Sequence, residues 1–363
     1  MKRIILSLAG CLILFFIYTS VQKSKSNNDL PIVEHVVLHE GTSDESFRGL
    51  HAIDDSVVVV GGNKGRFGYS LDAGIHWIFQ HIPGSSESQF RSVWAINDKE
   101  FLAVSAGSPT YIYQTDSRGQ DWSRVYADTA QSTFLDGIVF INDSIGFIYG
   151  DPVNGRFILL RTADGGRSWT KIEGPEAIDG EVSFAASGSA ITVGNSFMSI
   201  VTGGTVSRLH VTMDLRQGLG WTPSYIELAQ GTPSQGAFAH YWDKEKLYIV
   251  GGDYMAEEST YRTALVADLM TGQDDTVTMN KLENLPYTSD VCGDGELLYF
   301  TGTTGIRYLD STLHIMDTTA MHALAFSGKY VFSSGPSGRI GRVFKGTTEE
   351  LSKLLGALKN KNK

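Results

Sequence analysis

Cysteine is scarce in this sequence of 363 residues, which contains only Cys11 and Cys292. Cys11 lies in an apolar N-terminal segment, so Cys292 has no partner for an intramolecular disulfide in the rest of the chain. We expect Cys292 to be a buried, small apolar residue. Proline is also rare, with 9 residues against 40 glycines, a ratio typical of many tight turns between strands.

Positive charge is in deficit, because 40 acidic residues outnumber 30 Lys and Arg and give a formal net charge of -10. This balance argues against non-specific binding of a phosphate backbone, which needs a basic face. The sequence also lacks a G-x-S-x-G elbow, a P-loop and an H-E-x-x-H motif, and its nine histidines show no ligand spacing. We therefore predict no nucleic-acid partner, no metal and no cofactor.

The N-terminus has the pattern of a targeting segment. Lys2 and Arg3 precede an apolar run over 4–21, which is just long enough to span a bilayer. We interpret 1–30 as a signal peptide, an uncleaved membrane anchor or a lipoprotein signal. Leu8-Ala9-Gly10-Cys11 resembles a lipobox, in which Cys11 would be lipidated. Each alternative predicts an extracytoplasmic protein, in the periplasm or cell envelope, that meets a membrane only through its N-terminus.

Internal repeats dominate the remaining sequence. Three similar segments, each with two β-rich stretches around an Asp-Asp or Asn-Asp turn, begin at Phe47, Phe90 and Phe134. Each repeat continues into a third strand and a polar turn with a tryptophan, and these are Trp77, Trp122 and Trp169. The tryptophans recur at intervals of 45 and 47 residues. Such a period, with about four strands per unit, is typical of β-propeller blades.

Four weaker units extend the pattern and begin at Glu181, Gly236, Ser289 and Met321. The seventh unit lacks a fourth strand, which we expect Ile32–Leu38 to supply, because this closes the ring and removes exposed sheet edges. The prediction is an all-β fold over 31–346: a monomeric, seven-bladed propeller of four-stranded antiparallel blades. Residues 347–363 are expected to form a short helix or a basic tail, with Thr347 and Glu350 as a capping box.

The tryptophan turns carry the most recognisable motif, S/T-x-D-x-G-x-S/T-W. The motif residues of the two best copies are Ser70, Asp72, Gly74 and Trp77, then Thr162, Asp164, Gly166 and Trp169. Such an aspartate accepts hydrogen bonds from backbone N–H groups of its own turn, the glycine supplies a positive φ, and the tryptophan covers the turn. Because a repeated catalytic acid would be odd, we interpret both aspartates as structural.

This motif resembles the Asp-box, or BNR repeat, of sialidase-like propellers. The single Asp-box domain, seven short units and N-terminal signal also resemble the photosystem II assembly and stability factor family. That resemblance implies a seven-bladed propeller that acts as a binding scaffold rather than as an enzyme. It is specific for the fold and weak for function.

A binding site is expected where the inner strands begin, on the face opposite the Asp-box turns. Aligning the seven units places these residues there or nearby: Arg48, Arg91, Asp136, Glu181 and Tyr287. The loops between second and third strands add further polar residues, namely Lys64, Arg66, Asp151, Asn154, Arg156, Asp253 and Tyr254. Charges in such a funnel act strongly on ligands, and paired arginines can clamp a carboxylate or phosphate.

A structural or envelope module with a charge-balanced, solvated funnel and no ligand is one interpretation of these residues. Two further hypotheses give the funnel a ligand. The first is a non-enzymatic scaffold that binds a protein, an anionic peptide or an anionic glycan. The second is a carbohydrate-active enzyme, sialidase-like or another glycoside hydrolase or lyase, with Asp136 and Glu181 as candidate catalytic carboxylates. Sialidases combine three arginines with an Arg-Ile-Pro signature, whereas this sequence offers two candidate arginines and continues Arg48 with Gly49-Leu50.

Overall fold

The computed structural model describes residues 32–361 except 244–245, 269–277 and 283. The predicted N-terminal signal or anchor, including Cys11, lies outside the described residues. The chain divides into two units, one of His35–Val343 and one of Met1–Glu34 with Phe344–Lys363. Within the described part, no helix is both long and apolar enough to cross a membrane.

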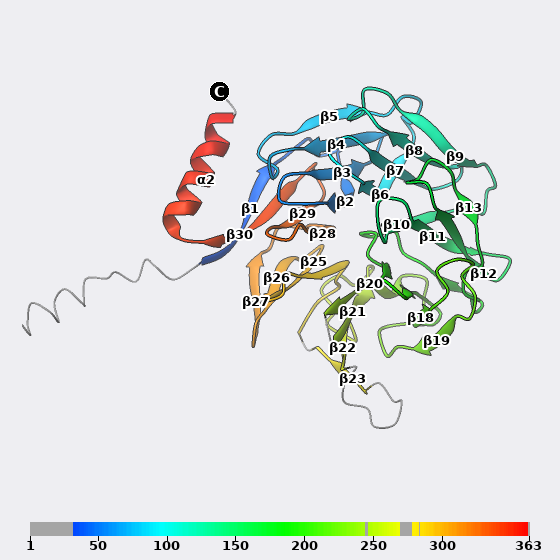
Figure 1. Ribbon diagram of the computed structural model, residues 1–363. Helices are drawn as coiled ribbons and strands as arrows, with labels where there is room; N and C mark the ends of the chain where they lie inside the picture. Colours follow the sequence, from blue (N-terminus) through cyan, green and yellow to red (C-terminus); the bar gives the residue numbers. More distant parts are fainter. Residues whose placement is uncertain (1–31, 244–245, 269–277, 283, 362–363) are drawn as a thin grey trace, which may run out of the picture. The chain divides into compact units, whose positions relative to one another are not determined.

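The larger unit is a seven-bladed β-propeller of four-stranded antiparallel sheets, which confirms the predicted fold (Figure 1). We number the blades in chain order from the one that contains Phe47. Blade 1 holds β2 (Phe47–Ala52), β3 (Val58–Gly62), β4 (Arg66–Ser70) and β5 (Ile78–His81). Blade 2 holds β6 (Gln89–Ala95), β7 (Phe101–Ala106), β8 (Thr110–Thr115) and β9 (Ser123–Asp128). Blade 3 holds β10 (Leu135–Phe140), β11 (Gly146–Val153), β12 (Arg156–Thr162) and β13 (Thr170–Lys171).

The later blades follow the same plan. Blade 4 holds β15 (Ile191–Val193), β16 (Met198–Val201), β18 (Arg208–Thr212) and β19 (Thr222–Tyr225). Blade 5 holds β20 (Gln235–Asp243), β21 (Lys246–Asp253), β22 (Ala264–Asp268) and β23 (Thr278–Lys281). Blade 6 holds β24 (Asp290–Gly293), β25 (Leu298–Gly302), β26 (Gly305–Leu309) and β27 (Leu313–Asp317). Blade 7 holds β28 (Ala323–Phe326), β29 (Val331–Ser334), β30 (Ile340–Gly346) and β1 (Ile32–His39).

The ring closes through its inner strands. The inner strands contact one another in blade order, and β28 of blade 7 contacts β2 of blade 1. The N-terminal strand β1 takes the outer position of blade 7 beside β30, as predicted. Blade 5 is extended by two short strands, β14 (Glu181–Val182) and β17 (Gly203–Gly204), which join the edge of β20.

The hydrophobic core lies between neighbouring blades. Because the sheets stack face to face, a middle strand such as β3 is buried along its whole length. Phe67 of blade 1 and Phe90 and Phe101 of blade 2 belong to one cluster, and all three side chains are fully buried. Burying each such phenylalanine contributes roughly 1.5–3 kcal/mol. The regular Phe-x-x starts of the repeats therefore correspond to packing between blades.

Strand register shows which residues share an end of the ring. Ala52 pairs with Val58, and Val58 pairs with Ser70, so the turn that follows Ser70 lies at the Ala52 end. Phe47 pairs with Gly62 at the opposite end. We call the end where the inner strands begin face A, and the end where they finish face B. The tryptophan turns therefore lie on face B.

Hydrogen bonds within the 162–169 turn show how the motif closes it. Asp164 Oδ1 accepts from the Ser168 N–H at 2.9 Å, and its Oδ2 accepts from the Ser168 hydroxyl at 2.6 Å. The Gly166 N–H donates to Thr162 Oγ1 at 2.9 Å, with a φ of 88° at Gly166. Trp169 Nε1 donates to the Gly166 carbonyl at 3.0 Å. Every polar group of the motif thus binds within the turn itself.

The smaller unit contains one helix in its described part, α2 (Thr348–Lys361). Its start is a reciprocal capping box. The Thr347 N–H donates to Glu350 Oε2 at 2.9 Å, and the Glu350 N–H donates to Thr347 Oγ1 at 3.3 Å. Glu349 and Glu350 place negative charge in the first turn, where it interacts favourably with the helix dipole.

Candidate functional site

One cavity of about 370 Å³ opens on face A, and we call it the funnel pocket. Four residues predicted from the repeats line it: Arg48, Arg91, Asp136 and Tyr287. The loop residues Asp151 and Tyr254 line it too, together with Ser183, Phe184, Phe238, Glu257 and His322. Inner strands far apart in the sequence thus bring basic, acidic and aromatic side chains to one place.

Two arginines form the basic side of the funnel pocket. Arg91 donates from Nε and Nη2 to Gln89 Oε1 at 3.2 and 2.9 Å. The Arg48 guanidinium has no hydrogen-bond or ion-pair partner within the described part of the chain. Burial lowers the pKa of Arg48, and the neighbouring charge of Arg91 lowers it further. The two cations therefore repel each other, and Asp136 acts on Arg91 electrostatically without forming an ion pair with it in the described part of the chain.

His322 adds no charge to this basic side. Burial, then the charges of Arg48 and Arg91, lower the pKa of His322 to about 3, so its imidazole is neutral at neutral pH. His322 Nε2 lies 3.4 Å from the Ser46 hydroxyl. The positive charge of the pocket therefore resides on the two guanidinium groups.

Two aspartates that share one serine form the acidic side. The Ser183 hydroxyl donates to Asp136 Oδ2, and the Ser183 N–H donates to Asp151 Oδ1 at 3.0 Å. Asp136 is only 1% exposed, and its Oδ1 has no hydrogen-bond partner among the described residues. Burial raises the pKa of Asp136 well above its usual range, and the nearby Asp151 raises it further. Burial also raises the pKa of Asp151.

Four aromatic rings form the third side. Phe184 and Phe238 stack with ring centroids 3.9 Å apart. Tyr254 meets both rings edge-on, at 6.4 and 6.2 Å, and Tyr287 meets Phe238 edge-on at 5.1 Å. Stacked and edge-on contacts at these distances are the geometries that aromatic rings prefer. The cluster gives the pocket an apolar wall of fixed shape.

Glu181 does not join the funnel pocket, contrary to the alignment of the fourth unit. It lies in β14, where its carboxylate accepts from Arg208 Nε at 3.0 Å and lies 3.1 Å from His210 Nε2. Burial raises the pKa of Glu181, but hydrogen bonds from His210, Arg208 and Thr202 outweigh it and hold the pKa at about 2. The alignment failed because blade 4 has no regular strand start here, and residues 183–186 line the pocket instead.

Two further predicted arginines also lie outside the funnel pocket. Arg66 forms an ion pair with Glu45 at 3.4 Å and lies 5.0 Å from the centre of the Phe79 ring. Arg156 forms ion pairs with Glu173 at 3.0 Å and Glu176 at 2.6 Å. Acidic residues of neighbouring loops, before β2 and after β13, neutralise both arginines.

The sequence reasoning missed Ser183, Phe184 and Phe238. The sequence did contain a signal for the two phenylalanines. The fourth unit reads SFAA around Phe184 and the fifth reads AFAH around Phe238, whereas the earlier units have a small residue at the corresponding position. Ser183 had no such signal, because its role depends on how a non-repeated loop passes Asp136 and Asp151.

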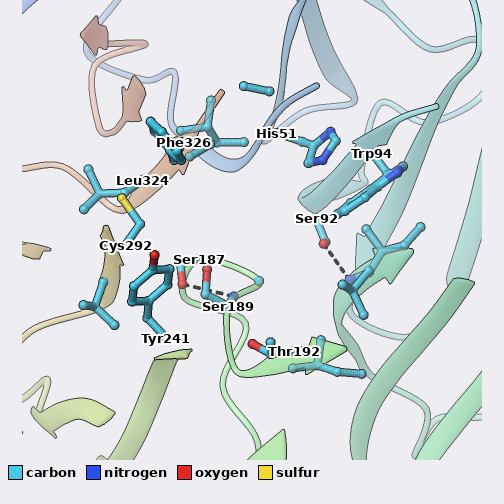
Figure 2. A pocket seen from close by; sticks show the side chains of 18 of the residues that line it. His51, Ser92, Trp94, Ser187, Ser189, Thr192, Tyr241, Cys292, Leu324 and Phe326 are labelled. Atoms are coloured by element: carbon cyan, nitrogen blue, oxygen red, sulfur yellow. Dashed lines mark hydrogen bonds between the residues drawn. The ribbon is translucent and has the colours of Figure 1, made fainter. Parts of the chain in front are cut away.

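A second cavity of about 370 Å³ lies at the face B end of the inner strands (Figure 2). Among the described residues, no Asp, Glu, Lys or Arg lines it, and burial lowers the pKa of its lining residue His240 to about 3. His51 stacks on Trp94 with ring centroids 3.6 Å apart, and its Nδ1 accepts from the Ala95 N–H at 3.2 Å. Burial lowers the pKa of His51 to about 3 and raises that of Cys292, whose sulfur Figure 2 shows beside Leu324. This cavity is therefore uncharged at neutral pH.

Comparison with known proteins supports the predicted resemblance. No family model matches the chain. The photosystem II assembly lipoprotein Ycf48 of Synechococcus sp. (strain CC9902) is 25% identical over 158 residues, or 42% of this chain and 46% of that protein. The match thus spans about half the length of this curated relative. By sequence, the chain resembles the photosystem II assembly factor family, as the repeats and motif predicted.

Solved structures share the fold. A structure of Ycf48 bound to D1 peptide is 14% identical, with a TM-score of 0.62 over 88% of this chain and 98% of that one. Ycf48 from Cyanidioschyzon merolae is 13% identical, with a TM-score of 0.59 over 85% and 98%. A catalytically inactive virginiamycin B lyase from Staphylococcus aureus is 16% identical, with a TM-score of 0.62 over 86% and 99%. Since an enzyme is as similar as the Ycf48 structures, these likenesses concern the fold alone.

Proposed function

We propose that this protein is a non-enzymatic assembly scaffold that holds an anionic segment of a partner protein in its funnel pocket. The observation that carries the proposal is the pair Arg48 and Arg91, which line one open cavity and lack a carboxylate partner among the described residues. The sequence relative is an assembly lipoprotein, and a solved Ycf48 structure contains a D1 peptide. Both features favour a protein partner.

The electrostatics of the pocket favour an anion. Two guanidinium groups that repel each other are stabilised when a carboxylate lies between them, and each group can donate two parallel hydrogen bonds to it. The partner is therefore expected to present a C-terminal carboxylate or an acidic side chain. The aromatic wall of Phe184, Phe238, Tyr254 and Tyr287 suits an apolar neighbour of that group.

The glycosidase alternative has less support. It requires two carboxyl groups on either side of a bound sugar, one of them with the raised pKa of a general acid. Glu181 lies outside the funnel pocket, and its pKa of about 2 does not suit that role. Turnover of a glycan by the purified protein would restore this alternative.

Export and anchoring are part of the proposal. The apolar segment over 4–21 and the lipobox-like Leu8-Ala9-Gly10-Cys11 support an extracytoplasmic protein tethered by its N-terminus. The relative is itself a lipoprotein. Labelling of cells with a radioactive fatty acid tests this, since a lipid anchor predicts label on the full-length chain and none on Cys11→Ala. A full-length chain that is found in membranes without label would favour an uncleaved apolar anchor.

Affinity capture from the cell envelope tests the binding proposal. The chain is compared with Arg48→Glu, Arg91→Glu and the control Arg216→Glu, an exposed arginine in the β18–β19 loop on face B. We expect both pocket variants to lose the partner and the control to retain it. Circular dichroism checks that all variants are folded. Equal recovery by all four proteins would contradict the proposal.

A further inference from the structure

We propose that Asp136 and Asp151 form a cation subsite of the funnel pocket, which receives a protonated nitrogen from the segment bound at Arg48 and Arg91. The nitrogen belongs to a lysine or arginine side chain or to an N-terminal ammonium group. The inference rests on the proposed function and narrows it: the bound segment carries a positive group near its negative one.

The first observation is that Asp136 and Asp151 have no cation paired with them. Asp136 and Asp151 lie close together, joined through Ser183, yet neither forms an ion pair within the residues that the structure describes. Both line the open funnel pocket, in which Asp151 is half-buried and Asp136 is 1% exposed. Buried carboxylates are normally paired with a cation or fully hydrogen-bonded.

Unpartnered buried oxygens are the second observation. Asp136 Oδ1 and the Tyr149 hydroxyl both lack a hydrogen-bond partner among the described residues, although Asp136 is 1% and Tyr149 0% exposed. Asp136 and Asp151 both act on the Tyr149 hydroxyl electrostatically, so the three groups are neighbours. Leaving such atoms unpaired costs free energy. Asp136 lines the funnel pocket and Tyr149 lies behind it, so a donor nitrogen beside Asp136 would recover the part that belongs to this carboxyl group.

The aromatic wall of the pocket also suits a cation. The faces of the aromatic rings carry negative electrostatic potential, so a cluster such as Phe184, Phe238, Tyr254 and Tyr287 attracts a positive group placed against it. Glu257 lines the same pocket and adds a negative charge on this side. The positive charges of Arg48 and Arg91 belong to blades 1 and 2. The pocket is therefore polarised, and a ligand with two opposite charges is held in one orientation.

Proton release should accompany binding. The groups that act on Asp136 are Asp151 and Tyr149 of β11, Ser183 of the 183–190 segment and Arg91 of β6. Burial and Asp151 raise the pKa of Asp136, while Ser183 and Arg91 lower it by less. A bound cation favours the carboxylate and so displaces a proton from the protonated form. Binding of a cationic ligand should therefore strengthen as the pH rises.

Matched peptides test the subsite by titration calorimetry. The probes are a series of hexapeptides with an acetylated N-terminus, alanines and a C-terminal phenylalanine that has a free carboxylate. Each peptide carries a single lysine, placed at a different internal position. Each lysine peptide is paired with the glutamine peptide of the same register. For the unmodified protein, we expect the best lysine peptide to bind about tenfold tighter than its glutamine partner, the size of one charge-assisted hydrogen bond.

Variants separate this inference from the proposed function. Asp136→Asn and Asp151→Asn should abolish the lysine preference but keep the need for a free carboxylate, while Arg48→Gln should weaken all peptides. The titration with the lysine peptide is repeated for the unmodified protein in buffers with different ionisation enthalpies. If binding releases protons, the measured binding enthalpy should change with the buffer. This measurement does not require that either Asp variant folds. Equal binding of lysine and glutamine peptides, still dependent on Arg48, would overturn the cation subsite alone. Binding of no peptide would count against both proposals.

Discussion

The structure predicts that Glu181→Gln destabilises the fold rather than removing a catalytic group. The Glu181 and Arg208 side chains are 0% and 7% exposed and form an ion pair, with His210 beside them. A glutamine would leave the buried Arg208 cation without a counter-charge. Removing one partner of a buried ion pair typically costs about 3–5 kcal/mol.

The pKa of Glu181 gives a second measure of the same effect. A carboxyl group whose pKa is lowered from 4.5 to about 2 on folding stabilises the folded state by about 3 kcal/mol at neutral pH, because each pKa unit is worth about 1.4 kcal/mol. Since the folded pKa lies below the unfolded one, this stabilisation is present above pH 4.5 and is lost as the pH falls towards about 2. The two arguments agree on a loss of about 3 kcal/mol.

Urea denaturation at neutral and acid pH measures this loss. Glu181→Gln should lower the free energy of unfolding by about 3 kcal/mol at neutral pH, and the difference from the unmodified protein should shrink in acid. The matched control is Glu173→Gln, whose partner Arg156 is 42% exposed, so a change within about 0.5 kcal/mol is expected. A Glu181→Gln variant as stable as the control would refute the argument.

Three further predictions concern other parts of the ring. Burial raises the pKa of Asp290 from 3.8 to about 7, so the stability that its protonated form gives the fold is lost as the pH rises from 3.8 to about 7. The melting temperature of the unmodified protein should therefore be lower at about pH 8 than at about pH 5, and this difference should be smaller in Asp290→Asn. Asp164→Ala removes the acceptor of two turn hydrogen bonds and should cost about 1–2 kcal/mol in urea denaturation, whereas an unchanged midpoint would exclude a structural role. An alanine Cβ at Gly61 would lie 2.5 Å from Val93 Cγ1, so Gly61→Ala should cost about 1–3 kcal/mol. The helical control Gly356→Ala has open space around its Cβ and should not destabilise; equal melting temperatures would contradict the packing argument.

The sequence predicted the ring and part of the pocket because both follow the repeat. Turn residues and tryptophan spacing define where the first three blades begin, and these three units are the most alike in sequence. Arg48, Arg91 and Asp136 occupy equivalent positions in blades 1 to 3, so their convergence followed from the period alone. Glu181 was misplaced because the fourth unit begins with an irregular segment that no period describes.

The chemistry of the pocket was beyond the sequence for a different reason. The raised pKa of Asp136 depends first on burial and then on Asp151, a residue from the next strand. The aromatic wall depends on Phe184, which belongs to the irregular segment, stacking on Phe238 of the next blade. Both are consequences of packing between blades, which pairwise alignment of units does not encode.

Differences between the side chains of successive blades explain why a ring of similar blades has a polarised pocket. Seven identical blades would surround the channel with one repeated side chain and could not orient a ligand. Here blades 1 and 2 contribute Arg48 and Arg91, blade 3 contributes Asp136 and Asp151, and later segments contribute the aromatic rings. The net charge of -10 does not prevent an anion from binding, because at physiological ionic strength charges more than about 8 Å away are largely screened. The nearest groups therefore decide which end of a ligand faces which blade.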